Sequence, residues 1–307
     1  MGLLVKGQWQ DKWYDTKNNN GNFKRQDSSF RNWVKADGSS KYMPVSGRYV
    51  LYVSLACPWA HRTLILRSLK GLENAIDVVV VEPLMLDQGW MLDKDMPFHS
   101  IYTHAQSDYT GRVTVPVLWD TETSTIVNNE SSEIIRMLNV EFDGLATKKV
   151  DDLYPIHLQN DIDEMNDFIY PNINNAVYRA GFATTQSAYE EAYQNLFKAL
   201  DKVEIILSTK RYLLGDHITE ADWRLFTTLV RFDAVYVAHF KCNKKRIVDY
   251  PNIWGYLKEL YQVSGVANTV NMDHIKSHYY ASHTMINPTG IIPLGPVIDF
   301  MDNHGRG

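Results

Sequence analysis

The feature that most constrains the fold is a cysteine–proline pair, Cys57 and Pro58, between an apolar run and a helical pattern. Residues 48–53 (RYVLYV) are rich in β-branched and aromatic side chains, which predicts a buried strand. Residues 63–69 repeat apolar positions at helical spacing until Gly71. Proline is tolerated in a first helical turn, because the N–H it lacks would have no partner there. The pattern therefore predicts a strand, then Cys57, then a helix beginning at Pro58.

A cysteine at such a junction is predicted to be reactive. The unpaired amides and the positive end of the helix dipole favour a thiolate over a thiol. An ordinary thiol has a pKa of about 8.5, whereas a helix N-terminus with further donors lowers the pKa to about 3.5–7.5. The alternative is a small apolar residue that fills the corner, because free cysteines are often buried. Residues 57–60 read Cys-Pro-Trp-Ala, so a mixed disulfide at Cys57 would need an external thiol to resolve it.

Length, charge and cysteine content narrow the class of protein. A chain of 307 residues favours two domains, and a net charge of −5 gives no basic surface for nucleic acid. No apolar run reaches the roughly 18 residues that cross a bilayer, and residues 1–6 lack a signal-peptide core. Cys57 and Cys242 are the only cysteines, which argues against a disulfide framework. We therefore expect a cytoplasmic protein that binds neither nucleic acid nor membrane.

The order of elements after Gly47 predicts an α/β domain of thioredoxin type. A buried parallel strand is expected over 75–81, and a polar excursion follows over 82–111. The remaining predicted elements are a strand over 113–119, a short strand over 125–127 and a helix over 130–138. Strand–helix–strand followed by a hairpin and a helix is typical of the thioredoxin-like fold.

Pro116 interrupts the strand predicted over 113–119. A cis peptide between Val115 and Pro116 would account for a proline at this position. It would direct the Val115 amide and carbonyl at a peptide-like ligand along that edge. The alternative is an ordinary edge-strand proline.

The second half of the chain is predicted to be helical, and the fold class is thus a thioredoxin-like domain followed by an all-α helical domain. Thr219 and Asp222 have the spacing of a capping box. Such a box stabilises the start of a helix and has no catalytic role. Helices are expected over about 155–177, 187–209, 220–240 and 252–262, with another over 267–280. The predicted domains are an N-terminal extension packed on the body over 1–46, a thioredoxin-like domain over 47–142, a helical domain over 150–285 and a C-terminal tail over 286–307.

Several motifs together resemble those of the glutathione transferase superfamily and, within it, the Xi class of S-glutathionyl-hydroquinone reductases. The capping sequence at residues 215–222 is a hallmark of the superfamily. The stretch between Trp90 and Arg112 is shorter than is usual for the class. The motifs that match the class are CPWAHR at 57–62, QGW at 88–90, VPVL at 115–118, NNES at 128–131, RFDAVYV at 231–237, HFKC at 239–242, HYY at 278–280 and INPTGIIPLGP at 286–296.

The resemblance implies a glutathione site in the first domain. Glu130 and Ser131 begin a helix, so they offer amides and a hydroxyl for a carboxylate, and the Glu130 side chain offers an acceptor for the γ-glutamyl amine. Simple helix capping is the alternative for this pair. Arg112 is expected to pair with the other carboxylate. Trp90 is expected to pack on the tripeptide backbone, and Val115 to bind it through its main chain.

The reaction that the resemblance implies is attack by the Cys57 thiolate on the sulfur of a glutathionyl-hydroquinone. A second glutathione then resolves the mixed disulfide at Cys57. Tyr178 matches the acid/base tyrosine of the class, which would protonate the leaving ring carbon. Tyr236 and Tyr279 match tyrosines that help to hold the thiolate. The chain has 18 tyrosines, and only the resemblance singles out these three. The class further implies a homodimer whose co-substrate is glutathione.

Two other functions remain open on the sequence: an Omega-like thioltransferase or dehydroascorbate reductase, and a non-catalytic binding protein with the glutathione transferase fold. Cys242 is expected to be structural. His274 and His278 have the i, i+4 spacing of a helical metal pair. They lack both the adjacent Glu of an HExxH motif and a nearby thiolate, so no metal site is expected.

Overall fold

The computed structural model describes residues 2–307, which form two compact units, each assembled from separate stretches of the chain. One unit contains the stretch up to Trp13 together with residues 26–151 and 268–283. The other contains residues 14–25, 152–267 and 284–307. The units follow spatial contacts rather than chain order, and the domain limits set from the sequence at 47–142 and 150–285 stay a prediction.

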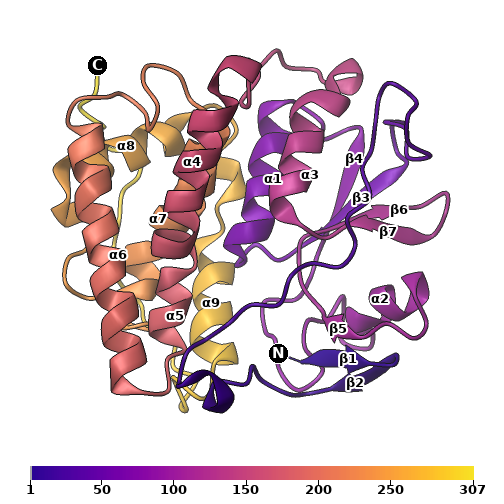
Figure 1. The fold of residues 1–307 in the computed structure, drawn as a ribbon, viewed down its shortest axis with the longest axis horizontal. Coiled ribbons are helices and arrows are strands. Elements are labelled where there is room, and N and C mark those ends of the chain that lie inside the picture. The colour runs from indigo at the N-terminus through magenta and orange to yellow at the C-terminus, as the bar shows by residue number, and fades with distance from the viewer. Residues whose placement is uncertain (1) are drawn as a thin grey trace. The chain divides into compact units, whose positions relative to one another are not determined.

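The first unit is built on a four-stranded sheet in the order β4-β3-β6-β7 (Figure 1). Strand β3 pairs in parallel with β4 and antiparallel with β6, and β6 pairs antiparallel with β7. Alternate β3 side chains, Tyr49, Leu51 and Val53, are fully buried, and each such side chain contributes roughly 1.5–3 kcal/mol of burial. The elements are β3 (Tyr49–Val53), α1 (Pro58–Leu69), β4 (Ile76–Val80), β6 (Val117–Asp120), β7 (Thr125–Asn128), α3 (Ser131–Arg136), a π-helical turn Met137–Glu141 and a 3₁₀ turn Asp143–Leu145. The strand–helix–strand–hairpin–helix order confirms the predicted thioredoxin-like fold.

A second, smaller sheet in this unit was not predicted. Strands β1 (Leu3–Val5), β2 (Gln8–Gln10) and β5 (Gly111–Arg112) pair antiparallel in the order β2-β1-β5. Helix α2 (His99–Ala105) also lies in the stretch that reads as a polar excursion. These elements are too short for a hydrophobic period to show in the sequence.

The strand around Pro116 differs from its prediction. The sequence suggests a strand over 113–119, but β6 begins only at Val117, because Pro116 has no N–H to donate to a ladder. The Val115–Pro116 peptide is cis, as predicted. Gly295–Pro296 is a second cis peptide, which was not predicted.

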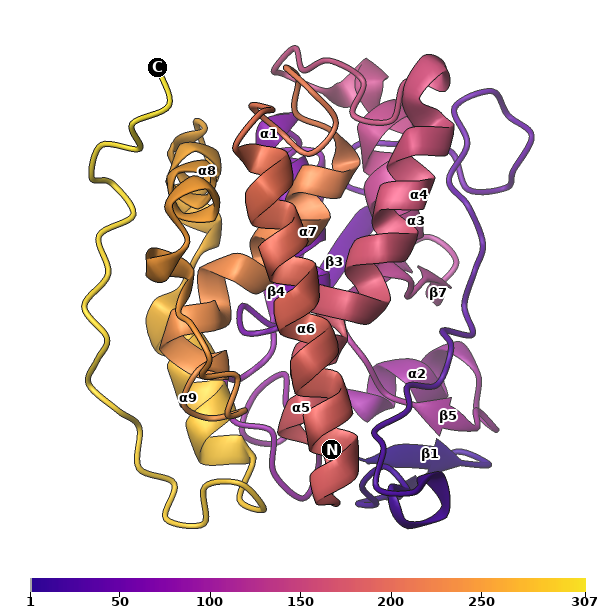
Figure 2. The same ribbon diagram turned by 60° about the vertical axis from the view of Figure 1, so that its left-hand side comes forward.

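The second unit is helical, with α6 as its longest helix (Figure 2). Its helices begin and end close to the predicted positions, but two of the long predicted helices are interrupted by π-helical turns over Tyr170–Asn174 and Phe232–Tyr236. The α-helices are α4 (Gln159–Ile169), α5 (Ala176–Gly181), α6 (Gln186–Leu207), α7 (Glu220–Arg231) and α8 (Pro251–Gln262), with 3₁₀ turns at Lys17–Asn19, Ile156–Leu158 and Ile247–Asp249. Among residues 2–307, no helix combines the length and the apolar composition that crossing a membrane requires.

Helix α7 begins with the predicted capping arrangement. The Asp222 carboxylate accepts hydrogen bonds from the Thr219 amide at 2.7 Å and the Thr219 hydroxyl at 2.9 Å. Its other oxygen accepts from the Leu213 amide and the Tyr256 hydroxyl. Such a cap contributes about 1 kcal/mol to helix stability.

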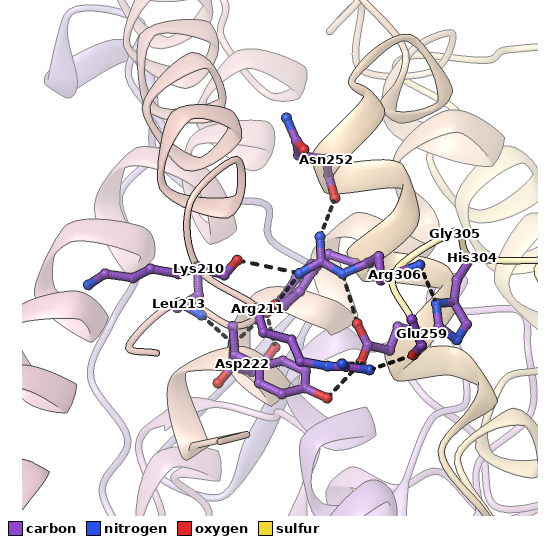
Figure 3. Close-up of polar contacts among 12 residues, drawn as sticks. Lys210, Arg211, Leu213, Asp222, Asn252, Glu259, His304, Gly305 and Arg306 are labelled. Atoms are coloured by element: carbon purple, nitrogen blue, oxygen red, sulfur yellow. Dashed lines mark hydrogen bonds and ion pairs between the residues drawn. The ribbon is translucent and has the colours of Figure 1, made fainter. Parts of the chain in front are cut away.

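The C-terminal tail is anchored to this unit through Glu259 of α8 (Figure 3). The Glu259 carboxylate accepts from Nε of Arg306 at 2.8 Å, from Nε of Arg211 at 2.8 Å and from the Tyr212 hydroxyl at 2.7 Å. Arg306 also donates to the backbone carbonyls of Arg211 and Asn252. Arg306, near the end of the chain, therefore completes a polar cluster around the buried Glu259 carboxylate.

Helix α9 (Met272–Ser282) comes late in the chain but belongs to the first unit. It follows a 3₁₀ turn at Ala267–Thr269, and its first turn is capped by the Asn271 side chain, which accepts from the His274 amide at 2.8 Å. Hydrogen-bond contacts hold this segment to the unit, among them those between His61 and Thr269, Ser54 and His274, Pro83 and His278, and Met85 and Ser282.

Candidate active site

Cys57 lies where β3 leads into α1 and is the N-cap residue of that helix (Figure 1). Its backbone is extended, Pro58 occupies the first helical position, and the Cys57 carbonyl accepts from the His61 amide at 3.0 Å. The predicted placement of the cysteine at a helix N-terminus is confirmed. The side chain is half-buried and is not in a disulfide. A thiol in this position has both the access and the helix amides that a nucleophile needs.

The loop with the cis peptide lies beside this cysteine. The Cys57 Sγ is 3.5 Å from the backbone carbonyl oxygen of Val115, to which a thiol hydrogen can be donated. Val115 is itself buried. The structure thus brings together two predicted site residues that are far apart in the sequence.

Glu130 and Ser131 begin α3, the helix that packs beside α1 (Figure 1). Glu130 is the N-cap: one carboxylate oxygen accepts from the Ser132 amide at 3.1 Å and the Ser132 hydroxyl at 2.9 Å. The other oxygen accepts from the Ser28 hydroxyl at 3.1 Å. Burial alone raises the pKa of Glu130, but the Ser132 hydrogen bonds, the positive charge of Arg62 and the Ser28 hydroxyl bring the pKa below its usual value. Glu130 is therefore a partly enclosed carboxylate that stays ionised.

Two residues that the sequence reasoning did not single out contact this corner. Arg62 of α1 is buried, stacks its guanidinium over the Trp59 ring at 4.6 Å and donates from Nη1 to the Ser131 hydroxyl at 3.4 Å. Ser28 belongs to the N-terminal extension. The available signal for Arg62 is its place in the CPWAHR motif, five residues after Cys57. Ser28 has no local signal, because its contacts depend on how the extension crosses the domain.

Trp90 is buried in the first unit and stacks on His278 of α9, with ring centroids 4.6 Å apart and planes 26° apart. The His278 ring nitrogen Nδ1 is 3.1 Å from the Pro83 carbonyl. Tyr279, the next residue of α9, is also buried and packs its ring edge-on against His278 and His283. The expected contact of Trp90 with a tripeptide backbone stays a prediction.

Arg112 lies in β5, which pairs with β1. Its guanidinium donates to the backbone carbonyls of Lys12 at 2.5 Å and Trp13 at 3.0 Å. It therefore holds the N-terminal segment. Its expected pairing with a ligand carboxylate stays a prediction.

Tyr178 and Tyr236 lie together in the helical unit, with ring centroids 6.1 Å apart. Tyr178 of α5 packs under the Arg25 guanidinium, which is 4.8 Å from the ring centroid. Tyr236 ends a π-helical turn and stacks on Phe240 at 5.5 Å. The structure thus brings these two predicted residues close to each other.

Cys242 is fully buried, and burial raises the pKa of its thiol well above the usual value. In the described part of the chain, no three His, Cys, Asp or Glu side chains gather as metal ligands would. His274 contacts the Ser54 hydroxyl instead, and His278 contacts Pro83 and Trp90.

A lone cysteine at the start of α1, a cis-proline loop beside it and a separate helical unit define the class of thioredoxin-fold proteins with an all-helical partner domain. Comparison with known protein families supports this two-domain class. The glutathione S-transferase N-terminal domain model matches residues 56–141, and the glutathione S-transferase C-terminal domain model matches residues 186–259.

Individual relatives narrow the class. The chain is 54% identical to glutathionyl-hydroquinone reductase YqjG of Escherichia coli K12, over all of this chain and 98% of the relative. It is 49% identical to glutathionyl-hydroquinone reductase PcpF of Sphingobium chlorophenolicum, over 96% of each. The glutathione-bound structure of YqjG superimposes with a TM-score of 0.90 at 51% identity, covering 99% of each chain. A Xi class transferase from Natrialba magadii superimposes with a TM-score of 0.94 at 50% identity, covering all of this chain and 97% of that one. The chain belongs to the Xi class of the glutathione transferase superfamily.

Proposed function

We propose that this protein is a glutathione-dependent reductase that removes glutathione from S-glutathionyl-hydroquinones, with Cys57 as the nucleophile. The observation that carries the proposal is the half-buried cysteine at the N-cap of α1, with its sulfur 3.5 Å from the Val115 carbonyl. The names of the relatives and the glutathione in the YqjG structure support the choice of substrate and co-substrate.

The reaction proceeds in two displacements at sulfur. The Cys57 thiolate attacks the sulfur of the glutathionyl thioether, the sulfur–ring carbon bond breaks, and the ring carbon takes the electron pair and a proton. Tyr178 supplies that proton, a step in which general acid catalysis contributes a factor of about 10²–10⁴. The products are the hydroquinone and a disulfide between Cys57 and glutathione. A second glutathione thiolate attacks this disulfide and releases oxidised glutathione and the Cys57 thiolate.

Binding of glutathione would use the two helix N-termini and the cis-proline loop. The ionised Glu130 carboxylate would accept the γ-glutamyl amine, and the Ser131 amide and hydroxyl would receive the neighbouring carboxylate. The Val115 main chain would pair with the cysteinyl amide, Trp90 would pack on the tripeptide and Arg112 would face the glycyl carboxylate. Tyr236 and Tyr279 would donate hydrogen bonds that stabilise the thiolate.

Mass spectrometry of the intact protein tests the reaction type. After incubation with a glutathionyl-hydroquinone and no free glutathione, we expect free hydroquinone and an added mass of one glutathione on Cys57. Cys57→Ser should lower turnover by at least about 10³-fold, because it removes the nucleophile. Cys242→Ala is the control and should keep turnover. Equal turnover by wild type and Cys57→Ser would refute the proposal.

The role of Tyr178 separates this reductase from an Omega-like thioltransferase. Tyr178→Phe should reduce kcat on glutathionyl-hydroquinone by about 10²-fold, because the ring carbon loses its proton donor. The same variant should reduce a simple glutathione mixed disulfide at the wild-type rate, since a sulfur leaving group needs no carbon protonation. Tyr250→Phe is a matched control, as that buried hydroxyl donates to Asp201 at 3.0 Å. Activity of Tyr178→Phe that equals the wild type on both substrates would favour the thioltransferase, which uses the same cysteine without an acid for the ring carbon.

We also propose that the protein acts in the cytoplasm, as its cysteine content suggests, and that it forms the homodimer that the class resemblance implies. Sedimentation equilibrium measures the assembly, and a mass of one chain of 35.4 kDa would contradict it.

A further inference from the structure

Two loops of the first unit carry groups that the proposed function assigns to glutathione, namely the Val115 main chain and the Glu130 carboxylate. One loop contains Thr114 and Val115 ahead of β6, and the other contains Asn129 and Glu130 between β7 and α3. The inference below rests on that proposed function. These residues lie outside the named β-strands, so contacts other than strand pairing must keep the two loops at a constant distance from each other.

The Tyr102 hydroxyl of α2 contacts both loops at once. It donates to the Thr114 carbonyl at 2.7 Å and accepts from the Thr114 amide at 3.2 Å. It also accepts from the side-chain amide of Asn129 at 3.2 Å. One donor and two acceptor positions are all that a phenol hydroxyl has, so its hydrogen-bonding capacity is fully used.

The surroundings of Tyr102 keep this hydroxyl neutral and dry. The side chain is fully buried among the rings of Phe30, Phe98 and Tyr109, with centroids 5.1–5.9 Å from its own. Burial raises the pKa of Tyr102 to about 12, against the opposing effect of its hydrogen bonds. The proton that bonds Thr114 is therefore retained throughout the physiological pH range, and water cannot replace it without opening the core.

Asn129 extends the connection to the N-terminal extension. The Asn129 side-chain oxygen accepts from the Phe30 backbone amide at 3.1 Å, and the Asn129 backbone amide donates to the Phe30 carbonyl at 3.0 Å. The Ser28 hydroxyl donates to the Asn129 carbonyl and to the Glu130 carboxylate. The extension therefore holds the outer side of the loop whose inner side is held by Tyr102.

We infer that Tyr102 is a positioning residue for glutathione: its hydroxyl joins the Thr114–Val115 loop to the Asn129–Glu130 loop, and so sets the spacing of the groups that bind the tripeptide. Glutathione has little rigidity of its own, so its affinity depends on a receptor that is already in the bound arrangement. Tyr102 itself touches no substrate in this role.

Tyr102→Phe removes the hydroxyl and keeps the ring. Tyr49→Phe is the matched control, because Tyr49 is equally buried and its hydroxyl donates to the Met43 carbonyl at 2.7 Å at the other end of β3. Amide hydrogen exchange of the free protein should be faster in Tyr102→Phe over residues 112–118 and 127–132, and unchanged there in Tyr49→Phe. The glutathione Kd, from titration calorimetry, should rise about tenfold in Tyr102→Phe, roughly the effect of one lost hydrogen bond with its positioning. The rate constant for attack by Cys57 on a glutathione-free disulfide probe should stay at the wild-type value, which a general loss of structure would not allow.

A double-mutant cycle with Asn129→Ala gives a second test, because it measures the coupling between the two side chains and not only the effect of one substitution. If the connection passes through the bond between the two side chains, the double variant should bind glutathione little worse than either single variant. Any of three results would overturn the inference: amide hydrogen exchange that is unchanged in both loops, a wild-type glutathione Kd in Tyr102→Phe, or strictly additive effects of the two substitutions on the Kd. Failure of the wild-type protein to bind glutathione is a different result: it would refute the proposed function, whereas a change confined to the variants bears on Tyr102 alone.

Discussion

Two glutamates, a partly enclosed Glu130 in one compact unit and a buried Glu259 in the other, illustrate how similar carboxylates take different roles. Glu259 of α8 is met by two guanidinium groups and a tyrosine hydroxyl, so its charge is neutralised within the protein (Figure 3). Glu130 ahead of α3 is hydrogen-bonded by the Ser132 amide and by two serine hydroxyls. The positive charge of Arg62 also acts on Glu130 and contributes to its lowered pKa. The groups that donate hydrogen bonds to Glu130 here are neutral, and we expect its carboxylate to attract a cationic ligand group.

The same contrast appears in their pKa values. Burial raises the pKa of both carboxyls, and in both the hydrogen bonds more than offset burial, so each pKa lies below the usual value. For Glu259 the opposing contributions come from Tyr212 and two arginines, whereas for Glu130 they come mainly from Ser132. An ionised carboxylate is therefore no sign of function by itself. The chemistry of its partners decides whether its charge is available.

The largest expected effect is on the free energy of unfolding when the Glu259 charge is removed. Glu259→Gln leaves Arg211 and Arg306 facing each other without a counter-charge. Breaking a buried ion pair costs about 3–5 kcal/mol, and because the Arg211 side chain is 40% exposed we expect water to offset part of this. The expected loss is about 2 kcal/mol in the free energy of unfolding, measured by urea denaturation. Glutathione affinity should not change.

Glu204→Gln provides the control for this substitution. Glu204 also supports α8: one oxygen accepts from the Asn252 amide and the other from the Ile253 amide, so glutamine keeps one of these two hydrogen bonds and removes the charge. If Glu259→Gln destabilises the protein no more than Glu204→Gln does, then Arg211 and Arg306 do not need the Glu259 charge for stability. The proposed difference between Glu259 and Glu130 would then be wrong.

The next largest effect is on glutathione binding when the Glu130 charge is removed. Glu130→Gln keeps the size and the helix cap but removes the charge, so the Kd for glutathione should rise about tenfold, the loss expected for one charge-assisted hydrogen bond. Binding of N-acetylated glutathione, which has no cationic amine, should be weak in the wild type and should not weaken further in the variant. Titration calorimetry with both peptides measures this difference.

Glu133→Gln is the matched control for Glu130→Gln. Glu133 lies on the same helix and forms an ion pair with Arg31 at 2.5 Å. Its substitution should leave the glutathione Kd unchanged. Equal weakening by the two variants would mean that the general negative potential, and not Glu130, attracts the amine.

The smallest effect concerns acid stability. Because the pKa of each carboxyl is lower in the folded than in the unfolded state, each contributes stability that is fully present above the unfolded value and is lost as the pH falls through the folded value. Urea midpoints measured from about pH 6 down to about pH 3 should therefore fall less steeply in Glu259→Gln than in wild type, and likewise in Glu130→Gln. Curves parallel to that of the wild type would contradict the lowered pKa values.

Local patterns in the chain were enough to predict much of the fold. Alternating burial in β3, the proline after Cys57 and the Thr219–Asp222 cap each depend on residues within one turn or one strand of each other. The cis peptide at Pro116 also followed from a proline where a strand was expected. The short strands of the N-terminal sheet and the π-helical turns inside the helical unit could not be predicted, because neither leaves a hydrophobic period long enough to detect.

The sequence by itself thus determined the two fold types, the N-terminal placement of Cys57 on its helix and the chemical nature of its neighbours. Only the tertiary structure decided which distant groups share a site: Ser28 with Glu130, Tyr102 with both Thr114 and Asn129, and Arg306 with Glu259. The reason is physical. Helix and strand formation depend on contacts between near neighbours, whereas a buried polar group takes whichever donor the folded chain brings within about 3 Å.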